Sequence, residues 1–293
     1  MRILLTGKNG QVGRELQRLL PYLGTVVALG REELDLTSAD AIRNTMRDVR
    51  PDIVVNAAAY TAVDHAEQET DRAFAINGTA PGIIAEEARR TDAFVVHYST
   101  DYVFDGTKKT PYLESDPPNP LSAYGRSKIA GENAIRASGA AHFIFRTSWV
   151  YAAHGRNFVH TILRLARERD ELKIVDDQIG APTWARTIAE TTAAALKSQY
   201  RNHCGLYHLT AIGAVTWFGF AKAILAEAKT LNPGLRIPEI IPITTSEYPL
   251  PAPRPANSRL DNTRLHTALG LSTPDWTLSL AQCMREILSP SGN

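Results

Sequence analysis

Residues 3–20 have the sequence ILLTGKNGQVGRELQRLL, an apolar run followed by a glycine-rich turn and a helical pattern. Gly7, Gly10 and Gly13 are spaced G-x-x-G-x-x-G, and glycine lets a backbone turn tightly and approach a diphosphate closely. The charge of a diphosphate is favoured at the positive end of the following helix. The stretch therefore predicts a strand, a phosphate-binding turn and a helix, with Gly7, Gly10, Gln11, Val12 and Gly13 as cofactor-binding residues.

The same alternation continues through the first 150 residues. The apolar runs RILLT, TVVAL, DIVVNAA, FVVHYS and HFIFRTSWVY are typical of strands that are buried on both faces, and helical patterns separate them. Strands of this kind form parallel sheets that helices cover on both sides. We predict an α/β fold with a doubly wound, Rossmann-like parallel sheet.

The alternation loosens after residue 150. We expect helices at 157–168 and 185–197, a strand and turn at 171–185, and a strand in GLYHLTA that returns to the main sheet. Residues 1–150 would form a dinucleotide-binding domain that a later segment around 185–212 rejoins. Residues 151–293 would form mainly a smaller substrate-binding domain, interleaved with the first.

Composition excludes several classes of partner. The 293 residues include 32 basic and 31 acidic side chains, a formal charge of +1, so no global field favours nucleic acid or an anionic membrane. The two cysteines form no metal-binding or disulfide pattern, as is usual in a reducing compartment. No signal-peptide pattern and no apolar run of membrane-spanning length is present. We expect a soluble, cytoplasmic protein.

The segment after the second predicted strand bears on the choice of cofactor. Arg31 stands where an acidic residue commonly binds the ribose of NAD, and its guanidinium is suited to a 2′-phosphate. Asp35 and Leu36 follow and would flank the adenine. NADPH is therefore slightly favoured over NADH. The alternative that stays open is that Arg31 forms a surface ion pair and that the protein uses both cofactors.

The third predicted strand ends in four small or polar residues. Ligands in open α/β sheets bind beyond the carboxyl ends of the strands, and small side chains let a cofactor approach the backbone. The cofactor-binding residues predicted here are Asn56, Ala57, Ala58 and Ala59. A buried strand with one capping asparagine is the alternative.

The heptapeptide SAYGRSK, residues 122–128, places Tyr124 and Lys128 on one face of a predicted helix. Ser99 and Thr100 end a different strand and bring a hydroxyl to the same region. Reduction of a carbonyl by hydride transfer needs such a set: a hydroxyl to orient the carbonyl, a tyrosine to protonate the alkoxide, and a lysine to lower the tyrosine pKa and hold the nicotinamide ribose. We predict Thr100, Tyr124 and Lys128 as catalytic residues, the last two also as cofactor-binding residues.

Eight segments in order carry a resemblance to a known family: TGKNGQVG, NAAAYTAVDHAE, STDYVFDG, YGRSK, RTSWVY, NFV, DDQIGAPT and RPANSRL. With them the chain resembles the extended short-chain dehydrogenase/reductases and, more closely, the dTDP-4-dehydrorhamnose reductases. In the related dehydratases a glutamate follows the Ser/Thr-Asp pair, where this chain has Tyr102. That difference favours a reductase.

The resemblance implies reduction of the C4 ketone of dTDP-4-dehydro-L-rhamnose by NADPH or NADH to give dTDP-L-rhamnose, a precursor of cell-surface polysaccharide. It also implies a set of substrate-binding residues: Thr100, Asp101, Tyr102 and Trp149 around the sugar, and Gln178, Pro182, Thr183, Arg254 and Asn257 nearer the nucleotide. Structural roles stay open for three residues. Trp149 could pack in the core, and Arg254 could cap the proline-rich turn. Asn77 could be either a family active-site residue or a helix cap.

Three further expectations concern partners and alternatives. The substrate would be a small nucleotide sugar, and a homodimer is possible. No cluster of closely spaced histidine and acidic residues stands out, so we predict no catalytic metal, and a structural magnesium stays open. The alternatives are an epimerase or reductase of another nucleotide sugar and a regulatory subunit that only binds the cofactor.

Overall fold

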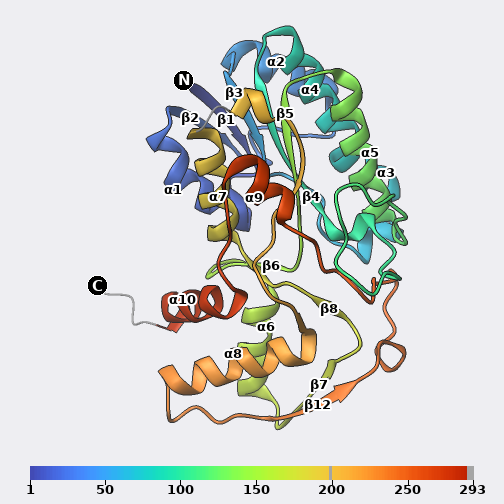
Figure 1. The fold of residues 1–293 in the computed structure, drawn as a ribbon, viewed down its shortest axis with the longest axis vertical. Coiled ribbons are helices and arrows are strands. Elements are labelled where there is room, and N and C mark those ends of the chain that lie inside the picture. Colours follow the sequence, from blue (N-terminus) through green and yellow to red (C-terminus); the bar gives the residue numbers. More distant parts are fainter. Residues whose placement is uncertain (198–199, 289–293) are drawn as a thin grey trace.

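The computed structural model describes residues 1–197 and 200–288. Its centre is a six-stranded sheet in the order β10-β5-β4-β3-β1-β2, and every neighbouring pair is parallel (Figure 1). The strands are β1 (Arg2–Thr6), β2 (Thr25–Leu29), β3 (Ile53–Asn56), β4 (Phe94–Thr100), β5 (His142–Thr147) and β10 (Gly205–His208). The predicted α/β fold with a parallel sheet is confirmed.

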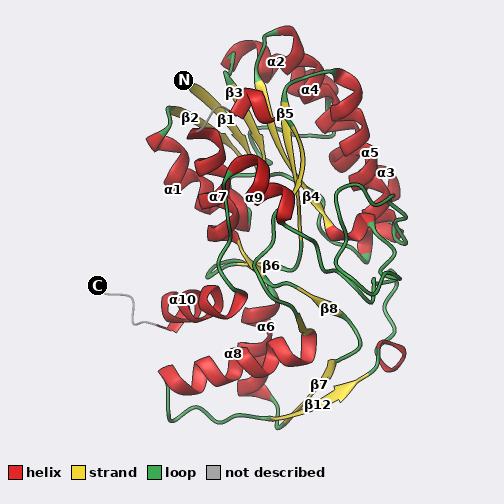
Figure 2. Cartoon of the chain, in the orientation of Figure 1, coloured by secondary structure: helices red, strands yellow, loops and turns green. Residues whose placement is uncertain are grey.

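Helices cover both faces of this sheet (Figure 2). On one face α1 (Gln11–Leu19), α7 (Ala185–Lys197) and α9 (Thr263–Leu269) bury apolar side chains against the strands. On the other face α2 (Ala39–Val49), α4 (Ala80–Arg90) and α5 (Ala123–Ser138) do the same. Because strand side chains alternate between faces, both sets of buried residues come from the same strands, and the sheet is doubly wound.

A separate hydrophobic cluster lies below the sheet in Figure 1. It joins the helices α6 (Phe158–Glu168), α8 (Trp217–Leu231) and α10 (Trp276–Leu288). The short strands of this part pair as β7 (Glu171–Val175) with β12 (Glu239–Ile243), β8 (Ile179–Gly180) with β11 (Val215–Thr216), and β6 (Val150–Tyr151) with β9 (Thr183–Trp184). The interleaved two-domain organisation stays a prediction, and the separation of this cluster from the two clusters that flank the sheet supports it.

Segments from the second half of the chain return to the main sheet. The expected segment 185–212 supplies α7 and β10, and α9 also packs on the sheet, which the sequence did not predict. The predicted strand HFIFRTSWVY is divided at residues 148–149 into β5 and β6. No helix among the described residues is long and apolar enough to cross a membrane.

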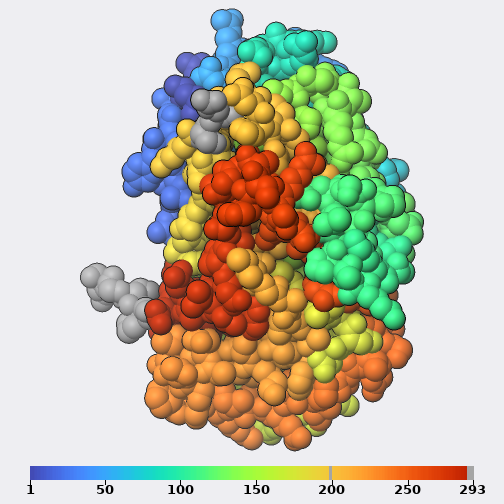
Figure 3. Space-filling view, in the orientation of Figure 1, coloured from blue at the N-terminus to red at the C-terminus, as the bar shows by residue number. Residues whose placement is uncertain are grey.

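The proline-rich segment 105–122 is an irregular loop that rests on the chain's later part. Tyr112 forms an isolated bridge with Leu260, and its ring stacks on Phe104 at a centroid distance of 4.1 Å. Figure 3 shows this loop, in green, against red and orange segments. The remaining short helical elements are η1 (Leu20–Tyr22), η2 (His65–Glu67), α3 (Thr70–Phe74), η3 (Ala75–Thr79, a π-helix), η4 (Asp101–Val103), η5 (Tyr200–His203) and η6 (Thr245–Glu247).

Candidate active site

A cleft of about 680 Å³ opens beyond the carboxyl ends of the central strands. This is where open α/β sheets bind ligands. Its lining includes twelve of the predicted cofactor-binding residues: Gly7, Gly10, Gln11, Val12, Arg31, Asp35, Leu36, Ala57, Ala58, Ala59, Tyr124 and Lys128. The remaining two, Gly13 and Asn56, do not line the cleft.

The glycine turn depends on close packing of main chain against main chain. Gly7 has φ +74°, and a Cβ there would lie 2.6 Å from the Ala58 nitrogen. A Cβ on Gly13 would lie 2.1 Å from the Gly7 carbonyl oxygen, so Gly13 lets α1 approach the turn. Gly10 is the N-cap of α1 and no side chain caps the helix. The first N–H groups of α1 are therefore available to an anion.

The loop after β2 presents a free cation. Arg31 is exposed, lines the cleft and has no hydrogen bond or ion pair within the described chain. Asp35 accepts hydrogen bonds from the Thr37 N–H at 2.9 Å and the Thr37 hydroxyl at 2.8 Å, which lower the pKa of its carboxyl, and the Arg31 charge lowers it further. Arg31 thus retains the capacity to bind a phosphate that the sequence predicted.

Asn56 does not line the cleft and instead joins the ends of β1 and β3 to the middle of β4. Its Oδ1 accepts from the Thr6 hydroxyl at 2.6 Å, and its Nδ2 lies 3.1 Å from His97 Nδ1. The side chain is 1% exposed. These contacts favour a structural role for Asn56, while Ala57–Ala59 line the cleft as predicted.

Tyr124 and Lys128 both face the cleft from the first turns of α5. Ser122 caps this helix, since its hydroxyl accepts from the Gly125 N–H at 3.1 Å. The Lys128 ammonium is buried, donates to the Tyr98 carbonyl at 2.6 Å and lies 3.3 Å from His97 Nε2. Burial lowers the pKa of Lys128 to about 8.

The predicted lowering of the tyrosine pKa is wrong for the chain alone. Burial raises the pKa of Tyr124 to about 12, and a hydrogen bond with Thr100 opposes this only in part. Lys128 is directed to the Tyr98 carbonyl and has no described hydrogen bond with Tyr124. Tyr124 is therefore fully protonated near neutrality, which is the form that a proton donor needs.

Predicted sugar-binding residues gather beside Tyr124. Thr100 ends β4, and its hydroxyl donates to Asp101 at 2.9 Å. The Tyr102 ring meets the Tyr124 ring edge-on at 5.8 Å, and the Arg254 guanidinium lies over Tyr102 at 5.9 Å. The structure thus brings Thr100, Tyr102, Tyr124 and Arg254 into one region.

Arg254 has two contacts that bear on its role. Its guanidinium donates to Asp64 at 2.7 Å and to the Ala252 carbonyl at 3.0 Å. The second contact is the turn-capping interaction left open by the sequence.

The Asp101 carboxyl lies buried beside Thr100. Burial raises its pKa to about 6, although hydrogen bonds from Ser258 and Thr100 lower it.

Trp149 adopts a left-handed backbone conformation with φ +47°. Its ring stacks on Trp217 at 3.5 Å, and Gly180 leaves room for it, since a Cβ there would lie 2.5 Å from the ring. Non-glycine residues rarely adopt this conformation, and such residues cluster at functional sites. The stacking agrees with core packing, and the sugar-binding role stays a prediction.

The other predicted substrate residues have structural contacts. The Gln178 amide donates to Thr245 at 3.0 Å, and Pro182 is buried. Thr183 is fully buried and accepts from the Ala211 N–H at 3.2 Å. The Asn257 amide donates to the carbonyls of Lys108 and Thr110 at 2.6 and 2.9 Å. Their substrate contacts stay predictions.

Asn77 connects two walls of the site. It lies in a π-helix, a form often found at functional sites, and is fully buried. Its amide exchanges two hydrogen bonds with the Tyr60 backbone, at 2.8 and 2.9 Å, and donates to Ser127 at 3.0 Å. Neither contact is the helix cap considered from the sequence.

The sequence did not single out several cleft residues. They include Tyr60, Thr61, Arg72, Thr147, Val150, His154, Gly155 and Arg156. Ser99, which the sequence placed near the substrate, lines the cleft and donates to the buried Glu132, which also pairs with Arg146 at 2.7 Å. The order of strands brings these residues together, and no local spacing marks them. Among the described residues no group of three or more metal-binding side chains occurs.

Comparisons with known proteins agree with this geometry. The family model described as the RmlD substrate binding domain matches residues 1–289. The chain belongs to this family. Relatives of this RmlD-family chain include the dTDP-4-dehydrorhamnose reductases of Burkholderia thailandensis, 51% identical over 99% of this chain and 100% of the relative, and of Escherichia coli K12, 44% identical over 99% of both.

Solved structures of RmlD-family relatives have the same fold. A dTDP-4-dehydrorhamnose reductase from Clostridium acetobutylicum superposes with a TM-score of 0.91 at 38% identity, covering 97% of this chain and 98% of that one. The reductase from Bacillus anthracis, solved in complex with NADP, gives 0.91 at 35% identity, covering 97% and 99%. A UDP-glucose 4-epimerase of Thermus thermophilus, at 21% identity, shares the fold alone.

Proposed function

We propose that the chain reduces the C4 ketone of dTDP-4-dehydro-L-rhamnose to dTDP-L-rhamnose with NADPH or NADH. One observation carries the proposal: Tyr124 and Lys128 line the same cleft as the glycine turn. The full-length similarity to dTDP-4-dehydrorhamnose reductases gives the substrate. The chain is an NAD(P)H-dependent oxidoreductase.

The residues of the cleft fit a dinucleotide. The uncapped N-terminus of α1 accepts a diphosphate, the small Ala57–Ala59 side chains allow close approach, and Arg31 is available for a 2′-phosphate. When bound there, NADPH or NADH would supply the hydride for the substrate carbon. NADPH is the favoured cofactor because of Arg31.

The chain's own residues supply the proton and the orientation. Tyr124 donates its hydroxyl proton to the ketone oxygen as that oxygen gains charge, and Thr100 hydrogen-bonds the same oxygen. Lys128 would hold the nicotinamide ribose, and its positive charge would stabilise the Tyr124 phenolate left by the transfer. Burial raises the Tyr124 pKa in the chain alone, so the Lys128 charge would have to be felt by Tyr124 more strongly when the cofactor is bound.

The sugar and nucleotide are assigned to the other side of Tyr124. We assign Asp101, Tyr102 and Trp149 to the sugar, and a second set to the nucleotide end of the substrate: Gln178, Pro182, Thr183, Arg254 and Asn257. The position of Arg254 over the Tyr102 ring supports this role of Arg254. On substrate binding, Arg254 would exchange its ion pair with Asp64 for one with the substrate diphosphate. A cytoplasmic location and a homodimer belong to the proposal as well.

The test is an assay with the purified chain, dTDP-4-dehydro-L-rhamnose and either cofactor. We expect loss of nicotinamide absorbance and formation of dTDP-L-rhamnose, identified by nuclear magnetic resonance. The control is dTDP-glucose, which has no C4 ketone and should cause no oxidation. Tight cofactor binding without oxidation would reject the proposal in favour of another nucleotide sugar or a regulatory subunit.

A further inference from the structure

The loop between β6 and α6 forms the wall of the cleft next to the glycine turn. His154, Gly155 and Arg156 of this loop all line the cleft. A Cβ on Gly155 would lie 3.8 Å from Gln11 Cγ, and Gln11 begins α1. The loop therefore lies at the helix end where a cofactor diphosphate is expected.

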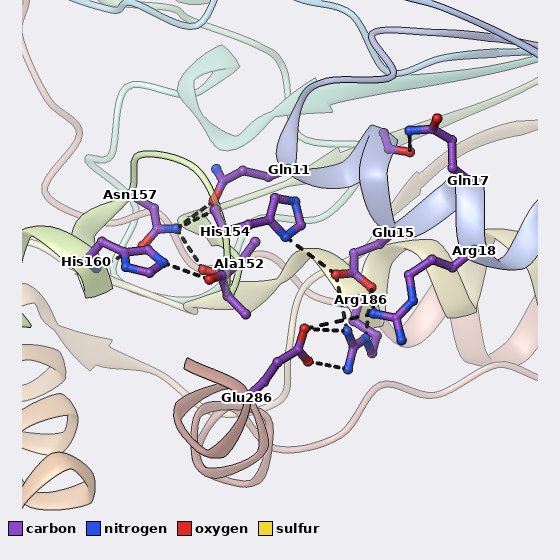
Figure 4. A network of polar contacts seen from close by, with 12 residues as sticks. Gln11, Glu15, Gln17, Arg18, Ala152, His154, Asn157, His160, Arg186 and Glu286 are labelled. Atoms are coloured by element: carbon purple, nitrogen blue, oxygen red, sulfur yellow. Dashed lines mark hydrogen bonds and ion pairs between the residues drawn. The ribbon is translucent and has the colours of Figure 1, made fainter. Parts of the chain in front are cut away.

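Hydrogen bonds hold this loop in place (Figure 4). The Asn157 amide donates to Gln11 Oε1 and to the Ala152 carbonyl, both at 2.9 Å. His160 Nε2 lies 3.0 Å from the Ala153 carbonyl oxygen. The backbone that carries Arg156 is thus tied to α1 and α6, so a ligand contact there requires little ordering.

The cations of the cleft differ in what they already bind. Arg72 pairs with Glu69 at 3.0 Å, and buried Lys128 donates to a carbonyl. Arg31 and Arg156 are exposed and have no hydrogen bond or ion pair within residues 1–197 and 200–288. NADPH carries two separate anionic groups, its diphosphate and its 2′-phosphate. The two free guanidinium groups equal these anionic groups in number and are opposite to them in sign of charge.

We infer that Arg156 binds the cofactor diphosphate, across from the N-terminus of α1. Arginine is suited to this because its guanidinium forms paired, charge-assisted hydrogen bonds with phosphate oxygens. Arg31, on the loop after β2, serves the 2′-phosphate and not the diphosphate. A segment that lies outside the predicted dinucleotide-binding domain therefore also binds the cofactor. The inference rests on the NAD(P)H use proposed above.

The test compares binding of NADH and NADPH to the whole chain and to single variants, measured by nicotinamide fluorescence. Both cofactors contain the diphosphate, so Arg156→Gln should weaken both by about tenfold and leave their ratio unchanged. Arg31→Gln should weaken NADPH selectively. Arg14→Gln is the matched control, because it removes the same charge from α1 at an exposed position outside the cleft.

Each result decides the assignment. Arg156→Gln affinities equal to those of Arg14→Gln would overturn it, and so would a loss confined to NADPH, which would place Arg156 at the 2′-phosphate. Arg156→Lys keeps the charge but not the paired hydrogen bonds, so its affinity for both cofactors should lie between those of Arg156→Gln and the unaltered chain, and an affinity no better than that of Arg156→Gln would argue against a phosphate contact. If Arg156→Gln lowers the melting temperature of the cofactor-free chain, Arg156→Lys and the salt dependence of binding carry the test. Absence of cofactor binding by the unaltered chain would instead reject the proposed function.

Discussion

At the scale of single residues, Tyr124 is the proton donor that the proposed reduction requires. Tyr124→Phe keeps the ring and its edge contact with Tyr102 but removes the proton. We expect kcat to fall at least ~10²-fold while NADPH affinity stays near its original value. Tyr22→Phe, at a side chain that is 81% exposed, is the control. Near-normal turnover in the Tyr124 variant would remove it from the acid role.

Lys128 gives a prediction that is independent of catalysis. Burial lowers its pKa from 10.5 to about 8. Between these values the unfolded chain binds a proton that the folded chain has released, so the free energy of unfolding rises with pH. The contribution is about 1 kcal/mol per pH unit across that interval.

Urea unfolding of the cofactor-free chain at pH values below and above this interval measures how much Lys128 changes the free energy of unfolding. Lys128→Met has a side chain of similar length that does not titrate, so its unfolding free energy should lack this rise. Equal slopes in the two proteins would mean that Lys128 keeps an ordinary pKa in the folded state.

At the scale of elements, the strand, turn and helix at the N-terminus depend on Gly13. Gly13→Ala would place a methyl group 2.1 Å from the Gly7 carbonyl oxygen, which is main chain and moves only with the turn. We expect a loss of about 1–3 kcal/mol of stability, as for other overpacked sites, together with weaker cofactor binding.

The matched control is Gly234→Ala, since the nearest atom to a Cβ there is 3.5 Å away in a side chain. Thermal unfolding and NADPH titration of both variants test the prediction. An unchanged cofactor affinity in Gly13→Ala would show that α1 need not pack so closely on the turn.

Sequence reasoning succeeded where a signal was local to one element. The glycine turn and the Tyr124–Lys128 pair each lie within a few residues, so spacing alone placed them in the cleft. It failed for contacts set by tertiary packing. The ion pair of Arg254 with Asp64 joins residues 190 apart. Arg156 lines the cleft in a loop that hydrogen bonds of Gln11 with Val150 and Asn157 hold at the start of α1. The lowering of the Tyr124 pKa that the sequence predicted is wrong for the chain alone, because tertiary packing buries the Tyr124 side chain.

At the scale of the whole molecule, one polar network joins α1 to distant helices (Figure 4). Glu15 of α1 is 2% exposed and accepts from Arg186 of α7 at 2.9 Å. Arg186 also pairs with Glu286 of α10 at 2.6 Å. The helix that begins at the glycine turn is thereby connected to the C-terminal helix, which packs with α8 in the separate cluster.

Removing members of this network should have unequal effects on stability. Arg186→Met leaves the buried Glu15 carboxylate without its main partner and should cost about 3 kcal/mol. Glu286→Gln, at a side chain 36% exposed, should cost less than about 1 kcal/mol. Because Glu15→Gln removes the charge that Arg186→Met leaves unpaired, the double variant should lose less stability than the sum of the two single changes. Urea unfolding of these four variants and of the unaltered chain measures the losses. Strictly additive losses for Glu15→Gln and Arg186→Met would show that α1 and α7 are not coupled through this pair.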